Sequence, residues 1–163
     1  MVETMGNGII WALLGAAIAT GVAGIGSIKG VGMAAETAMG AMSEDSSKFG
    51  KMLVLVLLPG TQGLYGFIVT VMMLMNIGVL GGTADISFAK GLLYFAACLP
   101  MAIVGLISAK QQAKASIASI SLLAKRPDQF GKAMIFPAMV ETYAVLALLI
   151  SLLAVANIGG IAI

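Results

Sequence analysis

Four long apolar stretches constrain the fold of this chain more than any other feature. They cover about residues 8–38, 50–80, 88–122 and 132–158, and each exceeds the roughly 20 residues that an α-helix needs to cross a bilayer core. Only 10% of residues are charged and the mean hydropathy is +1.07, far above that of a water-soluble domain. The sequence therefore predicts an all-α membrane protein with four transmembrane helices.

The chain repeats itself, without a gap, at an offset of 81 residues. This offset pairs Phe49-Gly-Lys51 with Phe130-Gly-Lys132, and Asn76-Ile-Gly78 with Asn157-Ile-Gly159. Hydrophobicity alone does not explain such matches, so we expect two tandem-duplicated hairpins, over residues 1–81 and 82–163. An even number of spans separates the copies, so both hairpins point the same way.

The basic residues predict the orientation of the hairpins. Three loops separate the stretches, at residues 43–48, 81–85 and 125–128. Of the nine basic residues, only Lys90 lies near the second loop. The other eight lie in or beside the first and third loops: Lys29, Lys48, Lys51, Lys110, Lys114, Lys125, Arg126 and Lys132. The chain is expected to be a multi-pass protein of the cell membrane. By the positive-inside rule, its hairpin loops face the cytoplasm and both termini lie on the outer side of the membrane.

Composition excludes several function classes. Histidine is absent and Cys98 is the single cysteine, so one chain builds neither a disulfide nor a Cys/His metal cluster. The net charge of +2 is too small and too scattered to indicate nucleic-acid binding.

Glu141 is the only acid deep inside an apolar stretch. A charged carboxylate at the centre of a bilayer costs roughly 3 kcal/mol or more unless a proton, a metal ion or a basic partner neutralises it. No basic residue lies within two turns on the same stretch. Ion carriage is the expected explanation, and the structural alternative is a protonated glutamate at a helix contact.

Three stretches bring polar groups to the depth of Glu141. Gln112 and Glu141 each lie about 15 residues from the third loop, which is about 22 Å along a helix. The repeat places Gly60 at the position of Glu141, so Thr61 and Gln62 share that level. Lys110 and Lys114 flank Gln112 and must therefore point away from it.

The second stretch presents these groups on one face, because helical spacing aligns Leu58, Thr61, Gln62 and Tyr65. Pro59 and Gly60 loosen the helix there, which frees a backbone carbonyl to turn toward an ion. Pro137, one turn before Glu141, permits a similar local distortion in the fourth stretch.

A hydroxyl, two amide oxygens, a carbonyl and a carboxylate form an oxygen-only cage with one negative charge. Such a cage suits a hard monovalent cation, and Na+ fits it. A proton needs only the carboxylate, so Gln62 and Gln112 are the informative residues. Their alternative role is hydrogen bonding between helices.

Small residues crowd the first stretch, at Gly15, Gly21, Gly24, Gly26, Gly30 and Gly32. Contact inside one four-helix bundle is one explanation. The length of the glycine run favours a second, in which many copies build a crowded inner ring.

The segments Leu57-Leu-Pro-Gly-Thr-Gln-Gly-Leu-Tyr-Gly66 and Met139-Val-Glu-Thr-Tyr143, on a duplicated hairpin, closely resemble the proteolipid subunit of bacterial V-type sodium-transporting ATPases. The resemblance covers nearly the whole chain. It implies a homo-oligomeric rotor ring that turns past a stator subunit, with a soluble ATPase head coupled through a central stalk. The implied partners are identical subunits, a stator subunit that supplies an arginine, stalk subunits at the cytoplasmic loops, and membrane lipid.

The same resemblance implies roles for individual residues. Glu141 corresponds to the ion-carrying carboxylate, and Tyr65 to the residue that holds it in its ion-locked conformation. The implied Na+ ligands are the Leu58 carbonyl, Thr61, Gln62, Gln112 and Glu141. Gly60 replaces a second carboxylate, which implies one ion per four helices.

The implied function is Na+ transport by ring rotation coupled to ATP hydrolysis, with H+ as the alternative ion. The chain lacks the Gly-x-x-x-x-Gly-Lys-[Ser/Thr] loop, so we expect a non-catalytic subunit. A small proton-coupled multidrug exporter also explains Glu141, but aromatic residues that would line its site make up only 6%. A purely structural membrane scaffold needs no buried acid.

Overall fold

The computed structural model describes residues 2–162, with side chains from residue 8 onward; residues 1 and 163, the outer ends of the predicted repeats, lie outside the described residues. Four helical segments in the described part are long and apolar enough to cross a membrane, which confirms the predicted fold class. The α-helices are α1 (Val2–Met42), α2 (Phe49–Leu57), α3 (Thr61–Asn76), α4 (Phe88–Lys125) and α5 (Phe130–Ile158).

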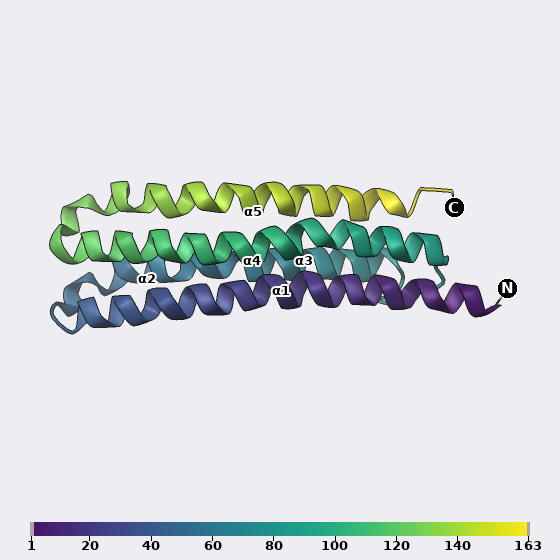
Figure 1. The fold of residues 1–163 in the computed structure, drawn as a ribbon, viewed down its shortest axis with the longest axis horizontal. Coiled ribbons are helices and arrows are strands. Elements are labelled where there is room, and N and C mark those ends of the chain that lie inside the picture. Colours follow the sequence, from purple (N-terminus) through teal and green to yellow (C-terminus); the bar gives the residue numbers. More distant parts are fainter. Residues whose placement is uncertain (1, 163) are drawn as a thin grey trace.

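The helices form an elongated bundle whose two hairpin loops lie at one end, while both ends of the chain lie at the other (Figure 1). The backbones of α1 and α4 nearly touch, because a Cβ atom on Gly15 or Gly26 would lie 2.8 Å from the Cα of Phe95 or Leu106. A Cβ on Gly21 or Gly32 would meet no atom within 4 Å. Contact inside the bundle thus explains only some of the glycines.

The second span is interrupted as predicted. A 3-10 turn over Leu58–Gly60 separates α2 from α3, because Pro59 has no N–H to donate. At Pro137, by contrast, α5 continues without a break. Proline there deprives the carbonyl of Ala133, four residues earlier, of its helical donor, and the Ser119 hydroxyl of α4 replaces that donor at 2.6 Å.

The second span also ends earlier than expected, at Asn76 rather than near residue 80. Gly78 has a φ of 78°, which glycine adopts without a steric penalty and which turns the chain out of the helix. The last residues of that apolar stretch therefore belong to the connection toward α4.

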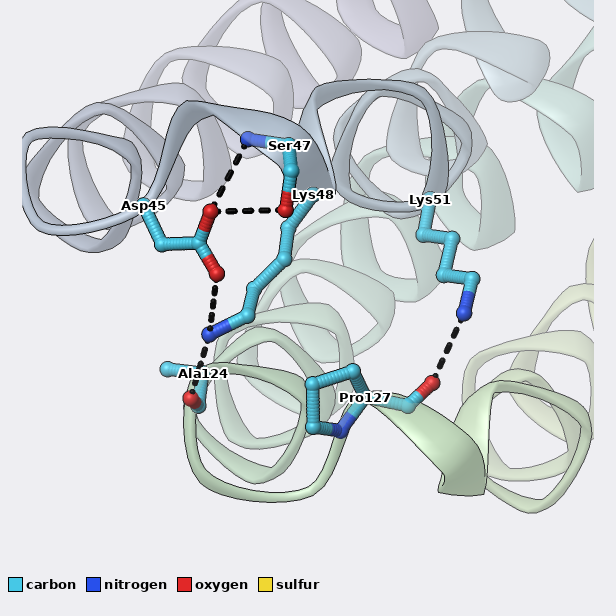
Figure 2. Close-up of polar contacts among 6 residues, drawn as sticks. All are labelled: Asp45, Ser47, Lys48, Lys51, Ala124 and Pro127. Atoms are coloured by element: carbon cyan, nitrogen blue, oxygen red, sulfur yellow. Dashed lines mark hydrogen bonds and ion pairs between the residues drawn. The ribbon is translucent and has the colours of Figure 1, made fainter.

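The two hairpin loops are joined by lysine side chains (Figure 2). Lys48 Nζ donates to the carbonyl oxygen of Ala124 at 2.9 Å, near the end of α4, and forms an ion pair of 3.1 Å with Asp45. Lys51 Nζ donates to the carbonyl oxygen of Pro127 at 2.9 Å. Cations at a helix C-terminus satisfy its free carbonyls, so these bonds tie the first loop to the third.

Two apolar clusters form the core, one on each side of a polar layer. The larger lies toward the chain termini and includes Met73, Met101 and Val155. The smaller lies toward the hairpin loops and includes Met52, Leu55 and Ile120. The fold thus holds the polar side chains at intermediate depth, far from both bundle ends.

Candidate functional site

Three helices converge on the carboxylate of Glu141. The Tyr65 hydroxyl of α3 donates a hydrogen bond of 2.6 Å to Oε1, and Gln112 Nε2 of α4 lies 3.3 Å from Oε2. Glu141 itself comes from α5 and is partly buried. The level predicted from helix register brings Gln112 to Glu141, and Tyr65, predicted on the same helix face as Thr61 and Gln62, reaches the carboxylate from α3.

The two glutamines are the most buried part of the site. Gln62 and Gln112 are both 0% exposed, and Gln62 Nε2 donates to Gln112 Oε1. Among the described residues, Gln62 Oε1 is a buried oxygen without a hydrogen-bond donor. A buried acceptor without a partner costs about 1–3 kcal/mol, and a cation at this oxygen would remove that cost.

Leu58 and Thr61 lie at the loosened turn next to the glutamines. The Leu58 carbonyl accepts the backbone N–H of Thr61 and also its hydroxyl, at 3.0 Å. The Leu58 carbonyl is thus engaged within its own turn.

Ser27 is part of the site environment, and sequence reasoning did not assign it a role. Its hydroxyl oxygen, on α1, accepts the N–H of Gly63 at 2.8 Å. Gly63 is in the first turn of α3, whose N-cap residue, Gly60, has no side chain to offer that N–H an acceptor. Ser27 therefore caps α3 from another helix, one residue beyond Gln62.

The site carries one acid and no adjacent base. Lys110 and Lys114 are exposed while Gln112 between them is buried, so the lysines point away, as expected. In the described part of the chain, the salt bridge found lies in the loops, between Lys48 and Asp45. Glu141 is therefore held by hydrogen bonds rather than by a countercharge.

The internal duplication also decides the family. The family model of the ATP synthase C-subunit matches the chain twice, over residues 14–73 and 95–154. The chain belongs to the ATP synthase C-subunit family. The second match follows the first at the same offset as the sequence repeat.

Two known proteins are similar to most of this chain. The V-type sodium ATPase subunit K of Enterococcus hirae is 46% identical over 154 residues, which cover 94% of this chain and 96% of that protein. The A-type ATP synthase subunit K of Methanocaldococcus jannaschii is 36% identical over 143 residues, or 88% of this chain and 62% of that protein. This member of the C-subunit family is thus a non-catalytic rotor subunit of a rotary ATPase in the membrane, in a family that forms rings.

Proposed function

We propose that this rotor subunit binds Na+ at Glu141 and carries it across the membrane as the ring turns. The ligands are the side chains of Thr61, Gln62, Gln112 and Glu141 with the Leu58 carbonyl, and Tyr65 holds the carboxylate. The observation that carries the proposal is the fully buried Gln62 oxygen, which has no donor among the described residues. Proton carriage alone gives that oxygen no partner.

The donor set suits a hard monovalent cation such as Na+ better than a soft metal. Every candidate ligand is an oxygen, and the single carboxylate balances one positive charge. The name of the Enterococcus hirae relative, a V-type sodium ATPase subunit, supports the same ion.

The proposed cycle depends on neutralising Glu141. Moving a charged carboxylate into hydrocarbon is opposed by the loss of its hydration free energy. Glu141 therefore faces the lipid only when an ion neutralises it. At the stator, an arginine from another subunit competes for the carboxylate and releases the ion.

The hairpin loops, with most of the basic residues, lie on the cytoplasmic side and contact the central stalk. The functional units are the two repeats, residues 1–81 and 82–163.

The deciding experiment measures how fast a hydrophobic carbodiimide labels Glu141 in the purified ring. Labelling is followed across pH, in Na+ or in K+ at equal ionic strength, with Glu141→Gln as the variant that lacks the reactive group. We expect selective protection by Na+, together with a folded but transport-inactive Glu141→Gln ring. Labelling that follows pH and ignores Na+ would identify a proton ring and leave the glutamines as helix contacts.

A further inference from the structure

Ser116 places a hydroxyl deep in the bundle, one helical turn from Gln112 toward the hairpin loops. The residue lies on α4 and is 0% exposed. Among the described residues, Ser116 Oγ and Gln62 Oε1 are the buried side-chain oxygen atoms without a hydrogen-bond partner. The proposed ion site accounts for Gln62, but Ser116 is not one of its ligands. A buried hydroxyl without a hydrogen bond is destabilising, so Ser116 requires a different partner.

The surroundings of Ser116 are apolar. The buried residues of the loop-side cluster include Leu55 of α2, Ile120 of α4 and Ala133 of α5. Side chains of this kind offer a hydroxyl neither a donor nor an acceptor. Polar partners for Ser116 in this part of the bundle are therefore backbone groups or other serines.

Pro59 deprives one backbone carbonyl in this cluster of its helical donor. Proline has no N–H for the carbonyl four residues earlier, which here belongs to Leu55. The N–H of Leu58, the residue before the proline, bonds the carbonyl of Val54 instead. Because Leu55 is 0% exposed, solvent outside the bundle does not reach its carbonyl.

Helix geometry directs Ser116 toward the turn that contains Pro59. At 3.6 residues per turn, Ser116 points between the directions of Gln112 and Ala113. Gln112 accepts a hydrogen bond from the first turn of α3. Ala113 and Pro59 meet, because atoms of both would lie within 3.5 Å of a Cβ atom on Gly30. The Ser116 hydroxyl therefore faces the interrupted part of the second span.

A neighbouring serine solves the equivalent problem on α5 directly. Pro137 removes the helical donor of Ala133, and the Ser119 hydroxyl donates to that carbonyl at 2.6 Å. Ser119 follows Ser116 by three residues, so the two side chains are neighbours on α4, about 5–6 Å apart at Cβ. A serine of α4 thus stands near each proline, but within the described structure Ser116 makes no direct bond.

We propose that Ser116 binds one buried water molecule, which bridges α4 to the Leu55 carbonyl. The Ser116 hydroxyl donates to the water, and the water donates one hydrogen bond to the Leu55 carbonyl and the other to Ser119 Oγ. Ser119 gives its own proton to Ala133 and keeps lone pairs that accept. Three polar partners are typical of a buried water.

The bridge supports the interrupted turn from the loop side. That turn, Leu58–Gly60, and the residue after it present two of the proposed sodium ligands, the Leu58 carbonyl and Thr61. Water held between α4 and α2 fixes the turn against α4 without contacting the ion. None of the three partners of the water is a proposed ligand, so the water site does not depend on which ion Glu141 carries.

A high-resolution structure of the purified ring, in a potassium buffer without Na+, tests the water site directly. Sodium is left out because Na+ and water scatter alike. We expect an ordered oxygen atom about 2.5–3.2 Å from both Ser116 Oγ and the Leu55 carbonyl oxygen. The same density should be absent in Ser116→Ala. A Ser116 hydroxyl that instead bonds the Gln112 carbonyl within α4, with no ordered oxygen beside it, would overturn the proposal.

A double-mutant cycle tests the role of the proline. Pro59→Ala restores an N–H that bonds the Leu55 carbonyl within the helix. Ser116→Ala should lower the thermal midpoint of the purified ring, and the decrease should be less than half as large in the Pro59→Ala background. Ser119→Ala with Pro137→Ala is the matched cycle, because a direct hydrogen bond links that pair.

Equal effects of Ser116→Ala in both backgrounds would contradict the bridge, because they would show that the hydroxyl does not serve the Leu55 carbonyl. Where Pro59→Ala does not assemble, the structure of the unaltered ring still decides. Both measurements are made without Na+. Their failure would therefore leave sodium protection of Glu141 unaffected, and a failure of sodium protection would leave the water site standing.

Discussion

The Tyr65 hydroxyl and Glu141 Oε1 are 2.6 Å apart, joining α3 to α5 at the level where Gln112 of α4 approaches the other carboxylate oxygen. Both oxygens of the carboxylate are thus fixed by different helices. A hydrogen bond to a charged acceptor contributes more than one between neutral groups, roughly 1.5–3 kcal/mol. The carboxylate is therefore held toward the bundle interior, and an ion bound there gains from that orientation.

Replacing Tyr65 by Phe should release the carboxylate while leaving the other proposed ligands in place. We expect Na+ to protect Glu141 from carbodiimide about tenfold less effectively, which corresponds to the loss of about 1.4 kcal/mol. The measurement is the Na+ concentration that halves the labelling rate. Tyr143→Phe is the matched control, because Tyr143 is 67% exposed and lines the surface groove between α4 and α5. Equal protection in both variants would show that Tyr65 does not hold the carboxylate.

Gln62→Leu should separate sodium binding from proton binding. The substitution removes a buried oxygen that has no donor in the described structure, and it also removes the donor to Gln112 Oε1. Loss of that hydrogen bond costs about 1–3 kcal/mol of stability, so folding of the purified variant is checked first. We expect sodium protection to disappear while the dependence of Glu141 labelling on pH remains, since a proton needs only the carboxylate. Retained sodium protection in the purified variant would remove Gln62 from the ligand set.

Register and repeat predicted the polar part of the site. Gln112 and Glu141 were expected at one level from their equal distance to the third loop, and they lie 3.3 Å apart. Helices have a fixed rise per residue, so two antiparallel helices with a short connection leave little freedom in relative depth. The offset of 81 residues added Gln62 to the same layer, where it bonds Gln112.

Details that depend on carbonyl partners were beyond sequence reasoning. Ala133 and Ala124 are the same residue type, and nothing in the sequence indicates which group donates to each carbonyl. In the structure the Ser119 hydroxyl donates to the carbonyl of Ala133, and Lys48 Nζ donates to that of Ala124. The first bond explains why α5 passes Pro137 without a break. Such choices follow from side-chain reach in three dimensions, which apolar periodicity does not encode.

The loop ion pair gives a prediction about pH. Asp45 accepts the N–H and hydroxyl of Ser47 and pairs with Lys48, and these contacts lower the pKa of its carboxyl below the ordinary 3.8. A carboxyl whose pKa is lower in the folded than in the unfolded state stabilises the fold above the unfolded-state pKa. This stabilisation is lost as the pH falls through the folded-state pKa. Asp45→Asn should thus slightly lower the thermal midpoint of the purified protein at neutral pH. The difference should vanish well below pH 3.8, and a difference that persists there would exclude the carboxylate as its cause.

Ser27→Ala should weaken the ion site without touching any proposed ligand. The Ser27 hydroxyl caps α3 at Gly63, next to Gln62, and the loss of a helix cap costs about 1 kcal/mol. The first turn of α3 would then fray at the residues that present Thr61 and Gln62. We expect about fivefold weaker sodium protection of Glu141, the equivalent of that energy.

Two further variants identify the hydroxyl as the cause. Ser27→Thr keeps the oxygen and should restore most of the sodium protection that Ser27→Ala loses. Ser121→Ala removes a hydroxyl that bonds the Ile117 carbonyl within α4 and should leave sodium protection unchanged. Labelling as a function of pH, without Na+, should be alike in all three, since protonation of Glu141 does not need an ordered α3 turn. A loss in Ser27→Ala that Thr does not restore would instead assign Ser27 to packing between α1 and α3.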